Sequence, residues 1–326
     1  MSFGFRVYEV GLVQGPAGRT RLDFADPLGD RNHFFLVVRT ALATLESQGT
    51  LSCMPDLVTP GADHRRLAEE GDPQIRFETV DVNAGKVSFR VRYGFHGEFD
   101  RAFGDGRDDG IDLTAMAATT WFRCDLYVPH QGFKGALVVE AIGSRCPVAM
   151  VTGWLGRESY ERDSSNWCRL RVQQVADRGH LRQMLRSSEN VELTLTRTSR
   201  SSDSSLDVDP VRLVQKVKSD LRREGLVGLA TSWLSDESED EAVFRVEEIA
   251  GYDPELLGRA GLHFSDAAIT VQDRDGKSRT FRPGKIREAF TYQISQDVRP
   301  DDVTWRDRTT QKVRETLSDE ADINIQ

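Results

Sequence analysis

The chain has 326 residues, of which 38% are hydrophobic and 29% are charged, and its formal net charge is −9 at pH 7. This length allows one large or two ordinary domains with a substantial core. The negative net charge excludes a nucleic-acid-binding protein that is basic overall, but it does not exclude local basic patches. Most of the excess negative charge lies after residue 200.

Cysteine and histidine usage gives no metal or cofactor motif. The four cysteines, Cys53, Cys124, Cys146 and Cys168, include no CxxC pair, and the six histidines form no HxH or HxxxH motif. We therefore expect no metal site and no cofactor. The N-terminal residues lack the apolar run of a signal peptide, and no apolar stretch is long enough to span a bilayer, so the sequence predicts a cytoplasmic protein.

Hydrophobic periodicity predicts alternating strands, helices and loops in the first part of the chain. Asn83-Ala84-Gly85 is typical of a hairpin turn between two strands. The expected elements are strands at 2–13, 74–82 and 86–96, a helix at 32–48, and loops at 54–73 and 97–112.

The densest part of the core is expected at 120–142. In TTWFRCDLYV, Phe122, Cys124 and Leu126 alternate with more polar residues, which predicts a strand with one buried face. KGALVVEAI is apolar on both faces, as in a strand that is covered on both sides. A short apolar helix is expected next, at 146–155.

The second part of the chain continues with mixed elements. The Ser-rich segment 199–209 predicts a linker between a domain at 1–198 and a smaller one at 210–326. Because hairpins and helices mix without regular βαβ alternation, we expect an α+β fold with mixed, largely antiparallel sheets and short helices. The expected elements are strands at 167–175, 190–197, 242–250 and 290–296, helices at 177–187, 210–224, 253–260 and 301–318, and a hairpin at Asp275-Gly276.

One acid lies inside the apolar run, and it is the best candidate for catalysis. A carboxylate in a sheet core is costly unless it is paired, which draws attention to Glu140. A metal-dependent nuclease or nucleotide hydrolase would combine Glu140 with Asp125 on the preceding strand, and with Asp105 or Asp109. The other interpretation of Glu140 is structural, with an arginine partner or access to solvent at the strand end.

Three groups of basic residues are candidate contacts to a phosphate backbone. They lie in the segment 274–287, on the predicted helix 210–224, and on the polar side of the strand 167–175. The first has a structural alternative as a solvated edge strand, and the second as an ordinary amphipathic helix. The candidate nucleic-acid-binding residues are Lys277, Arg279, Arg282, Lys285, Arg287, Arg212, Lys216, Arg223, Arg169 and Arg171.

The run from 121 to 197 resembles the Rex A type of phage-exclusion protein and related bacterial antiviral defence proteins. The resemblance rests on the aromatic strand WFRCDLYV, the turn QGFKG, an apolar strand, a helix ending in GWL, and a following strand–helix–strand unit. It implies a homodimeric, DNA-binding sensor that works with a membrane-protein partner. This chain departs from the family in its acidic C-terminal third and its few lysines.

Three functions remain open from the sequence. The first is a non-catalytic nucleic-acid-binding sensor in a phage-exclusion or antiviral defence system, with DNA as the favoured ligand. The second is the metal-dependent nuclease or nucleotide hydrolase that uses Glu140. The third is a structural or protein-interaction role, for which the acidic C-terminal part offers a surface.

Overall fold

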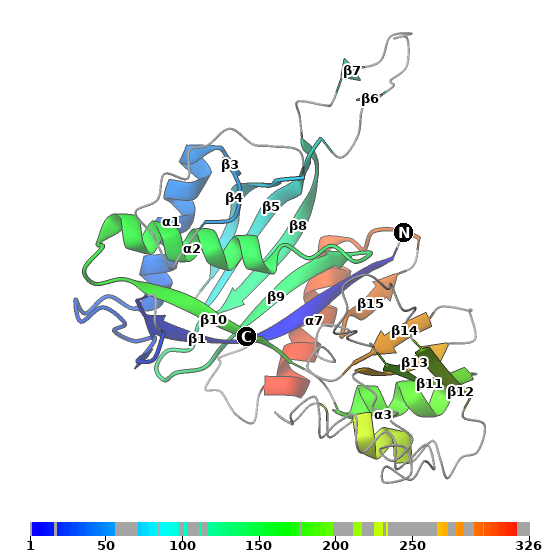
Figure 1. Cartoon of the computed structure of the whole chain (residues 1–326). Coiled ribbons are helices and arrows are strands. Elements are labelled where there is room, and N and C mark those ends of the chain that lie inside the picture. The colour runs from blue at the N-terminus through cyan, green and yellow to red at the C-terminus, as the bar shows by residue number, and fades with distance from the viewer. Residues whose placement is uncertain are drawn as a thin grey trace, which may run out of the picture. The chain divides into compact units, whose positions relative to one another are not determined.

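The computed structural model shows an α+β fold with mostly antiparallel sheets, as the sequence predicts (Figure 1). None of the described helices combines the length and apolar character needed to span a bilayer. The structure describes residues 2–15, 18–55, 71–83, 85–97, 101–102, 111–112, 117–175, 178–188, 190–197, 211–216, 225–230, 233, 266–272, 278–282, 290–295 and 297–317.

The named elements of the described residues agree with most of the expected ones. The helices are α1 (Phe34–Gln48), α2 (Val148–Arg162), α3 (Arg178–Ser187) and α7 (Asp302–Leu317). The strands are β1 (Phe3–Gln14), β2 (Arg21–Leu22), β3 (Thr50–Ser52), β4 (Pro73–Asn83), β5 (Lys86–His96), β6 (Arg101–Ala102), β7 (Ile111–Asp112), β8 (Ala117–Tyr127), β9 (Gly135–Ile142), β10 (Cys168–Gln174), β11 (Asn190–Arg197), β12 (Val211–Lys216), β13 (Asp266–Gln272), β14 (Ser278–Phe281) and β15 (Tyr292–Ser295).

The chain divides into two compact units. Unit 1 consists of Met1–Val175 together with Thr291–Gln326, and unit 2 is the continuous stretch Ala176–Phe290. This division differs from the domains expected at 1–198 and 210–326. The segment 199–209 lies outside the described residues, and it joins β11 to β12, which are neighbours in one sheet. Its polar composition therefore marks a connection within unit 2.

Unit 1 is built on a sheet that, over the described residues, has nine strands in the order β10-β1-β9-β8-β5-β4-β3, with β2 and β15 also paired to β1. Alternate residues of these strands point to opposite faces. One face packs against α1 and α2, and its core includes Phe77, Phe89 and Phe122. The other face packs against α7 through Phe5, Val7 and other apolar residues. Figure 1 shows α1 and α2 in front of the sheet and α7 behind it.

The strand next to β1 is interrupted by unit 2. In the antiparallel pairing, Tyr8 lies opposite Gln174 and Phe5 lies opposite Tyr292. The N–H of Val175 donates to the carbonyl oxygen of Val7 at 2.8 Å. Continuing both registers places Val175 opposite Val7 and Thr291 opposite the adjacent Arg6. The end of β10 and the start of β15 are therefore two parts of one edge strand, and unit 2 is inserted between them.

Unit 2 has a smaller antiparallel sheet in the order β12-β11-β13-β14. One face of this sheet is apolar. Val191, Leu193, Ile269 and Phe281 pack with residues of α3 and of the helical segment 225–230. The register of β13 and β14 joins Gln272 to Ser278, which confirms the hairpin expected around Asp275-Gly276.

One predicted element is wrong in kind. The helix expected at 210–224 is replaced at Val211–Lys216 by the strand β12, which pairs along its whole length with β11. The four-residue spacing of Leu213, Val217 and Leu221 favours a helix, but pairing with β11 prevails over this local pattern. The strand expected at 242–250 and the helix expected at 253–260 lie outside the described residues, as does most of the loop at 54–73.

Candidate functional site

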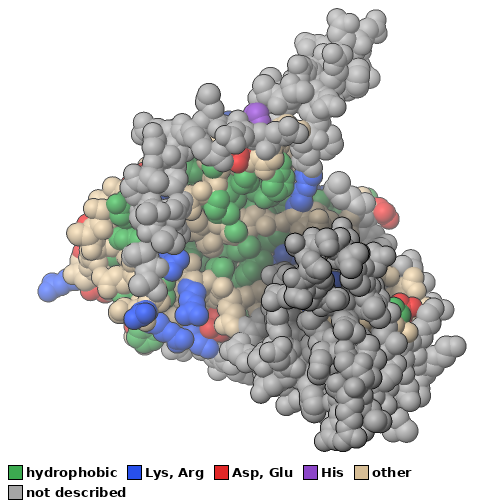
Figure 2. All heavy atoms as spheres, in the orientation of Figure 1, with side chains coloured by type: hydrophobic (Ala, Val, Ile, Leu, Met, Phe, Trp, Pro, Cys, Tyr) green, Lys and Arg blue, Asp and Glu red, His purple; other side chains and the backbone are tan. Residues whose placement is uncertain are grey.

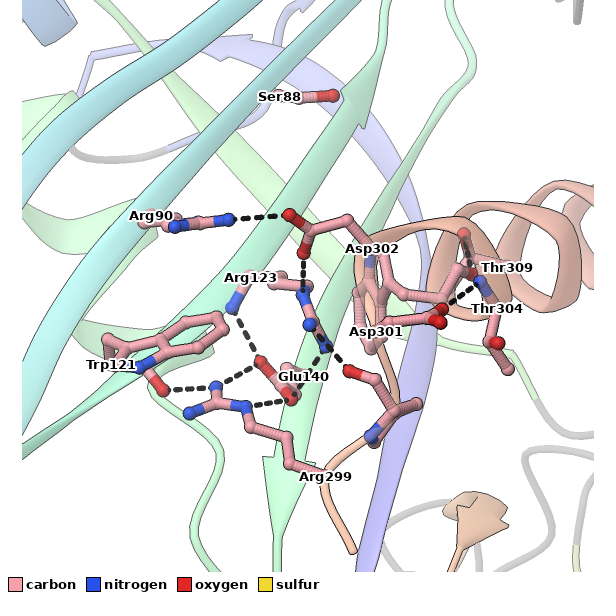
Figure 3. A network of polar contacts seen from close by, with 12 residues as sticks. Ser88, Arg90, Trp121, Arg123, Glu140, Arg299, Asp301, Asp302, Thr304 and Thr309 are labelled. Carbon is pink, nitrogen blue, oxygen red and sulfur yellow. Dashed lines mark hydrogen bonds and ion pairs between the residues drawn. The ribbon is translucent and has the colours of Figure 1, made fainter.

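A buried polar network joins β8 and β9 to the segment that precedes α7 (Figure 3). Glu140 is fully buried, and two arginines bind its carboxylate. Arg299 donates from Nε to one carboxylate oxygen at 3.0 Å and from Nη2 to the other at 2.6 Å. Arg123 donates from its backbone N–H at 2.9 Å and from Nη1 at 3.3 Å. These paired, charge-assisted bonds offset the cost of burying the carboxylate.

The second half of the network connects Arg123 to the N-terminal end of α7. Arg123 Nε donates to Asp302 Oδ1 at 2.8 Å, and Arg123 Nη2 donates to the carbonyl oxygen of Pro300 at 2.6 Å. Arg90 donates to the other oxygen of Asp302 at 2.8 Å. The N–H of Thr304 donates to the side chain of Asp301 at 2.7 Å, which caps the first turn of the helix.

The ring of Trp121 lies among the same cations. The guanidinium carbons of Arg299, Arg90 and Arg123 lie 3.1, 4.7 and 4.9 Å from the ring centroid. Arg299 also donates to the carbonyl oxygen of Trp121. Stacking on an aromatic face is a favourable placement for a guanidinium, because the ring quadrupole attracts the cation. The network and the ring together fix the segment 299–302 against the sheet of unit 1.

Asp125 lies on the same sheet face as Glu140 and is also occupied by partners. It is 4% exposed. Its oxygens accept from Ser88 Oγ at 2.6 Å, Lys86 Nζ at 3.2 Å and Trp305 Nε1 at 3.2 Å. The carboxylate is thus held in place by three donors from β5 and α7.

These contacts favour the structural interpretation of Glu140, with arginine partners, over a catalytic one. Both predicted catalytic carboxylates bind protein cations, and the described residues contain no group of three or more His, Cys, Asp or Glu side chains that could hold a metal ion. Asp105 and Asp109 lie outside the described residues. The described part of the chain therefore gives the nuclease hypothesis no metal centre.

Two of the buried cysteines, Cys124 and Cys168, do not offer a nucleophile either. Burial raises the pKa of the Cys168 thiol to about 11 and also raises the pKa of Cys124. Both thiols therefore remain protonated at neutral pH, and a protonated thiol is a poor nucleophile.

Two of the predicted basic residues lie together on unit 1. Arg169 lies opposite Val13 of β1, and Arg21 of β2 lies opposite the same residue from the other side. Arg171 follows two residues after Arg169 and so lies on the same face. We call Arg21, Arg169 and Arg171 the β10 patch. Lys and Arg side chains are among those exposed on the face of the chain that is drawn in Figure 2.

The surroundings of the β10 patch are cationic and partly apolar. Arg21 and Arg171 are exposed, and Phe133 is 52% exposed. A Cβ atom at Gly11, which pairs with Arg171, would lie 3.3 Å from the carbonyl oxygen of Phe133. Glu9, on the same strand face, accepts from Lys134 at 3.3 Å, so its charge is already balanced by a lysine.

The other predicted basic residues belong to unit 2. Register places Arg212 and Lys216 in the same alternation as Val214, opposite Thr196 and Glu192 on β11. Arg282 follows directly after β14 and is exposed, and Arg279 lies opposite Val271 in the register of β14 with β13. The single projecting edge expected for Lys277, Arg279, Arg282, Lys285 and Arg287 stays a prediction. Lys277, Lys285, Arg287 and Arg223 lie outside the described residues.

The sequence reasoning missed the residues that surround Asp125 and Glu140. Lys86, Ser88 and Arg90 alternate with the apolar residues of β5, so the same period that predicts the strand also places them on one polar face. Arg299 gives no comparable signal, because its partner Glu140 lies 159 residues away in the chain. Only the folded arrangement brings the two together.

Comparisons with known proteins do not assign the chain to a family. No protein-family model matches the sequence, and the search of curated proteins finds no match. The functional argument therefore depends on the residues described above.

Proposed function

We propose that the chain is a non-catalytic nucleic-acid-binding protein, and that the β10 patch is part of its contact surface. The observation that carries the proposal is the register that brings Arg21 of β2 and Arg169 and Arg171 of β10 to the two sides of β1. Arginine suits this role because its planar group donates several hydrogen bonds to phosphate oxygens. The ion pairs of Glu140 and Asp125 support the non-catalytic part of the proposal.

The exposed ring of Phe133 favours contact with unpaired bases. Aromatic rings near a cationic surface stack on bases and tolerate any sequence, which is how many single-strand binding proteins work. Duplex DNA would contact the arginines alone. Comparing the two ligands therefore tests whether Phe133 contributes.

The cellular setting remains a proposal from the resemblance over 121–197. That setting is a homodimeric sensor of a phage-exclusion or antiviral defence system in the cytoplasm, acting with a membrane-protein partner. Unit 2 enters the proposal through Arg212 and Lys216, which lie opposite Thr196 and Glu192 in the register of β12 with β11, and through Arg282, which directly follows β14.

The test is binding of labelled single-stranded and duplex oligonucleotides at several salt concentrations. We expect weak, sequence-independent binding that falls as salt rises, by about 0.9 log units per log unit of salt for each duplex phosphate contacted. The triple variant Arg21→Gln/Arg169→Gln/Arg171→Gln should weaken binding and lower this slope by up to about 3.

The matched control is Arg39→Gln/Arg76→Gln/Arg308→Gln. It removes the same charge from exposed positions on α1, β4 and α7. Equal losses in the two triple variants would mean that only net charge matters, and would contradict the assignment to the β10 patch. No binding by the unaltered chain at low salt would reject nucleic acid as the ligand and leave the protein-interaction role.

A further inference from the structure

A second site in unit 1 is suggested by a cavity of about 100 Å³ beside the first turn of α7. Its walls include Lys86, Ser88 and Arg90 of β5, Asp125 of β8 and Arg306 of α7. One water molecule needs about 10–15 Å³ of such space. The cavity therefore has room for a tetrahedral anion together with a small substituent.

The donors on this wall are only partly used by the protein. Lys86 forms one ion pair, with Asp125 at 3.2 Å, although an ammonium group has three N–H donors. Arg90 donates one to Asp302, although a guanidinium has five. Arg306 is exposed and has no polar side-chain partner among the described residues. Three cations thus retain donors at one cavity.

Three acids line the cavity, Asp81, Asp125 and Asp302, and the last two are bound by donors of the protein. Asp125 accepts from three donors, and Asp302 bridges Arg90 and Arg123. The N-terminal end of α7 is capped by Asp301, so the helix terminus itself contributes no open site. What remains available to a ligand is a set of N–H donors from two elements.

We propose that this cavity binds a small phosphate-bearing anion between Lys86, Arg90 and Arg306. A tetrahedral group with three free oxygens can accept from donors on separate elements at the same time, whereas a planar carboxylate presents only two oxygens. The site is independent of the β10 patch, because the two share no residue.

Asp302 is the internal competitor of such a ligand. Its side chain is 58% exposed and lies 2.8 Å from Arg90. A bound phosphate would share Arg90 with this carboxylate, and the two negative charges would repel each other. Removal of that charge by Asp302→Asn should therefore tighten the binding of phosphate.

The experiment is calorimetric titration of the full chain with inorganic phosphate at low ionic strength, and with acetate as the planar comparison. We expect saturable binding of phosphate that is tighter than that of acetate. Arg306→Gln should weaken it about tenfold, as expected for the loss of one charge-assisted contact. Arg308→Gln, two residues further along α7 and also exposed, should leave it unchanged.

Two results of this titration would overturn the proposal, and a third follows from the β10 patch variant. One is an absence of saturable phosphate binding, and the other is equal affinity in the Arg306→Gln and Arg308→Gln variants. The triple variant of the β10 patch separates the sites: it should retain phosphate binding at full affinity. If phosphate binding disappears in that variant, the anion binds at the β10 patch and the cavity is not its site.

Discussion

Units 1 and 2 differ in how the chain supplies their parts. Unit 2 is one continuous stretch, and its described core is apolar. Unit 1 is assembled from two stretches that are separated by the whole of unit 2, and its buried Glu140 takes a partner from each stretch, Arg123 and Arg299. Unit 1 therefore needs its C-terminal segment, which carries Arg299, to offset the free-energy cost of burying the Glu140 carboxylate in its sheet.

The largest effect is expected when the buried charge of Glu140 is removed from unit 1. Glu140→Gln should destabilise unit 1 by about 3–5 kcal/mol, because it leaves two arginines without their anion. Chemical denaturation followed by tryptophan fluorescence measures this loss. The control is Glu78→Gln, which removes a surface pair with Arg92 on the same sheet and should cost less than about 1 kcal/mol. Equal losses would show that the burial of Glu140 is unimportant.

A second variant tests whether unit 1 folds without unit 2. Deleting Ala176–Phe290 and joining Val175 directly to Thr291 preserves the register against β1. We expect a folded unit 1 with cooperative thermal unfolding and a midpoint shifted by no more than about 10 °C. Circular dichroism during heating measures this. A matched deletion that starts one residue later and so adds one residue to the strand should be less stable, because it shifts the register and reverses the faces after it.

The smallest expected effect concerns Glu158 on α2, which is 7% exposed. Burial raises the pKa of Glu158, against a lowering influence of Arg162 and hydrogen bonds from Thr44 and Gln48 of α1. The folded state therefore holds this proton more tightly than the unfolded state, and the stability it contributes at low pH is lost as pH rises through the folded pKa.

Glu158→Gln should accordingly raise the thermal midpoint of unit 1 slightly at pH 7, by about 2 °C or less. The gain should vanish in acid, where Glu158 is itself protonated. Thermal scans between pH 4 and 7, compared with Glu161→Gln on the same helix, measure the difference. A gain that does not depend on pH would contradict the proposed cause.

Local patterns predicted the elements of unit 1 well and its arrangement poorly. The strands β1, β4, β5, β8, β9 and β10 and the helices α1 and α7 follow from their hydrophobic period. The pairing of Arg299 with Glu140 does not, since no local rule joins residues so distant in sequence. The polar composition of 199–209 suggested a domain boundary, whereas the chain leaves unit 1 at Val175 inside a strand-forming stretch.

For the candidate site, the sequence singled out Glu140, Arg169 and Arg171 but not the residues that the fold places beside them. The lone acid Glu140 stood out because a buried charge requires a partner, and the structure provides arginines. Arg169 and Arg171 were predicted on a polar strand face, which the burial pattern confirms. Their neighbour Arg21 was missed, because only the pairing of β2 with β1 brings it to that face.

The interruption of the strand beside β1 also affects how the sheet of unit 1 meets other molecules. A long uninterrupted edge strand exposes a row of unpaired N–H and C=O groups, which can recruit a strand from another chain and begin aggregation. At one border of this sheet the edge is divided between β10 and β15, and at the other border β3 spans only Thr50–Ser52. Because unit 2 is inserted between β10 and β15, the edge strand beside β1 is not continuous. A strand from another chain therefore finds a shorter row of unpaired N–H and C=O groups there.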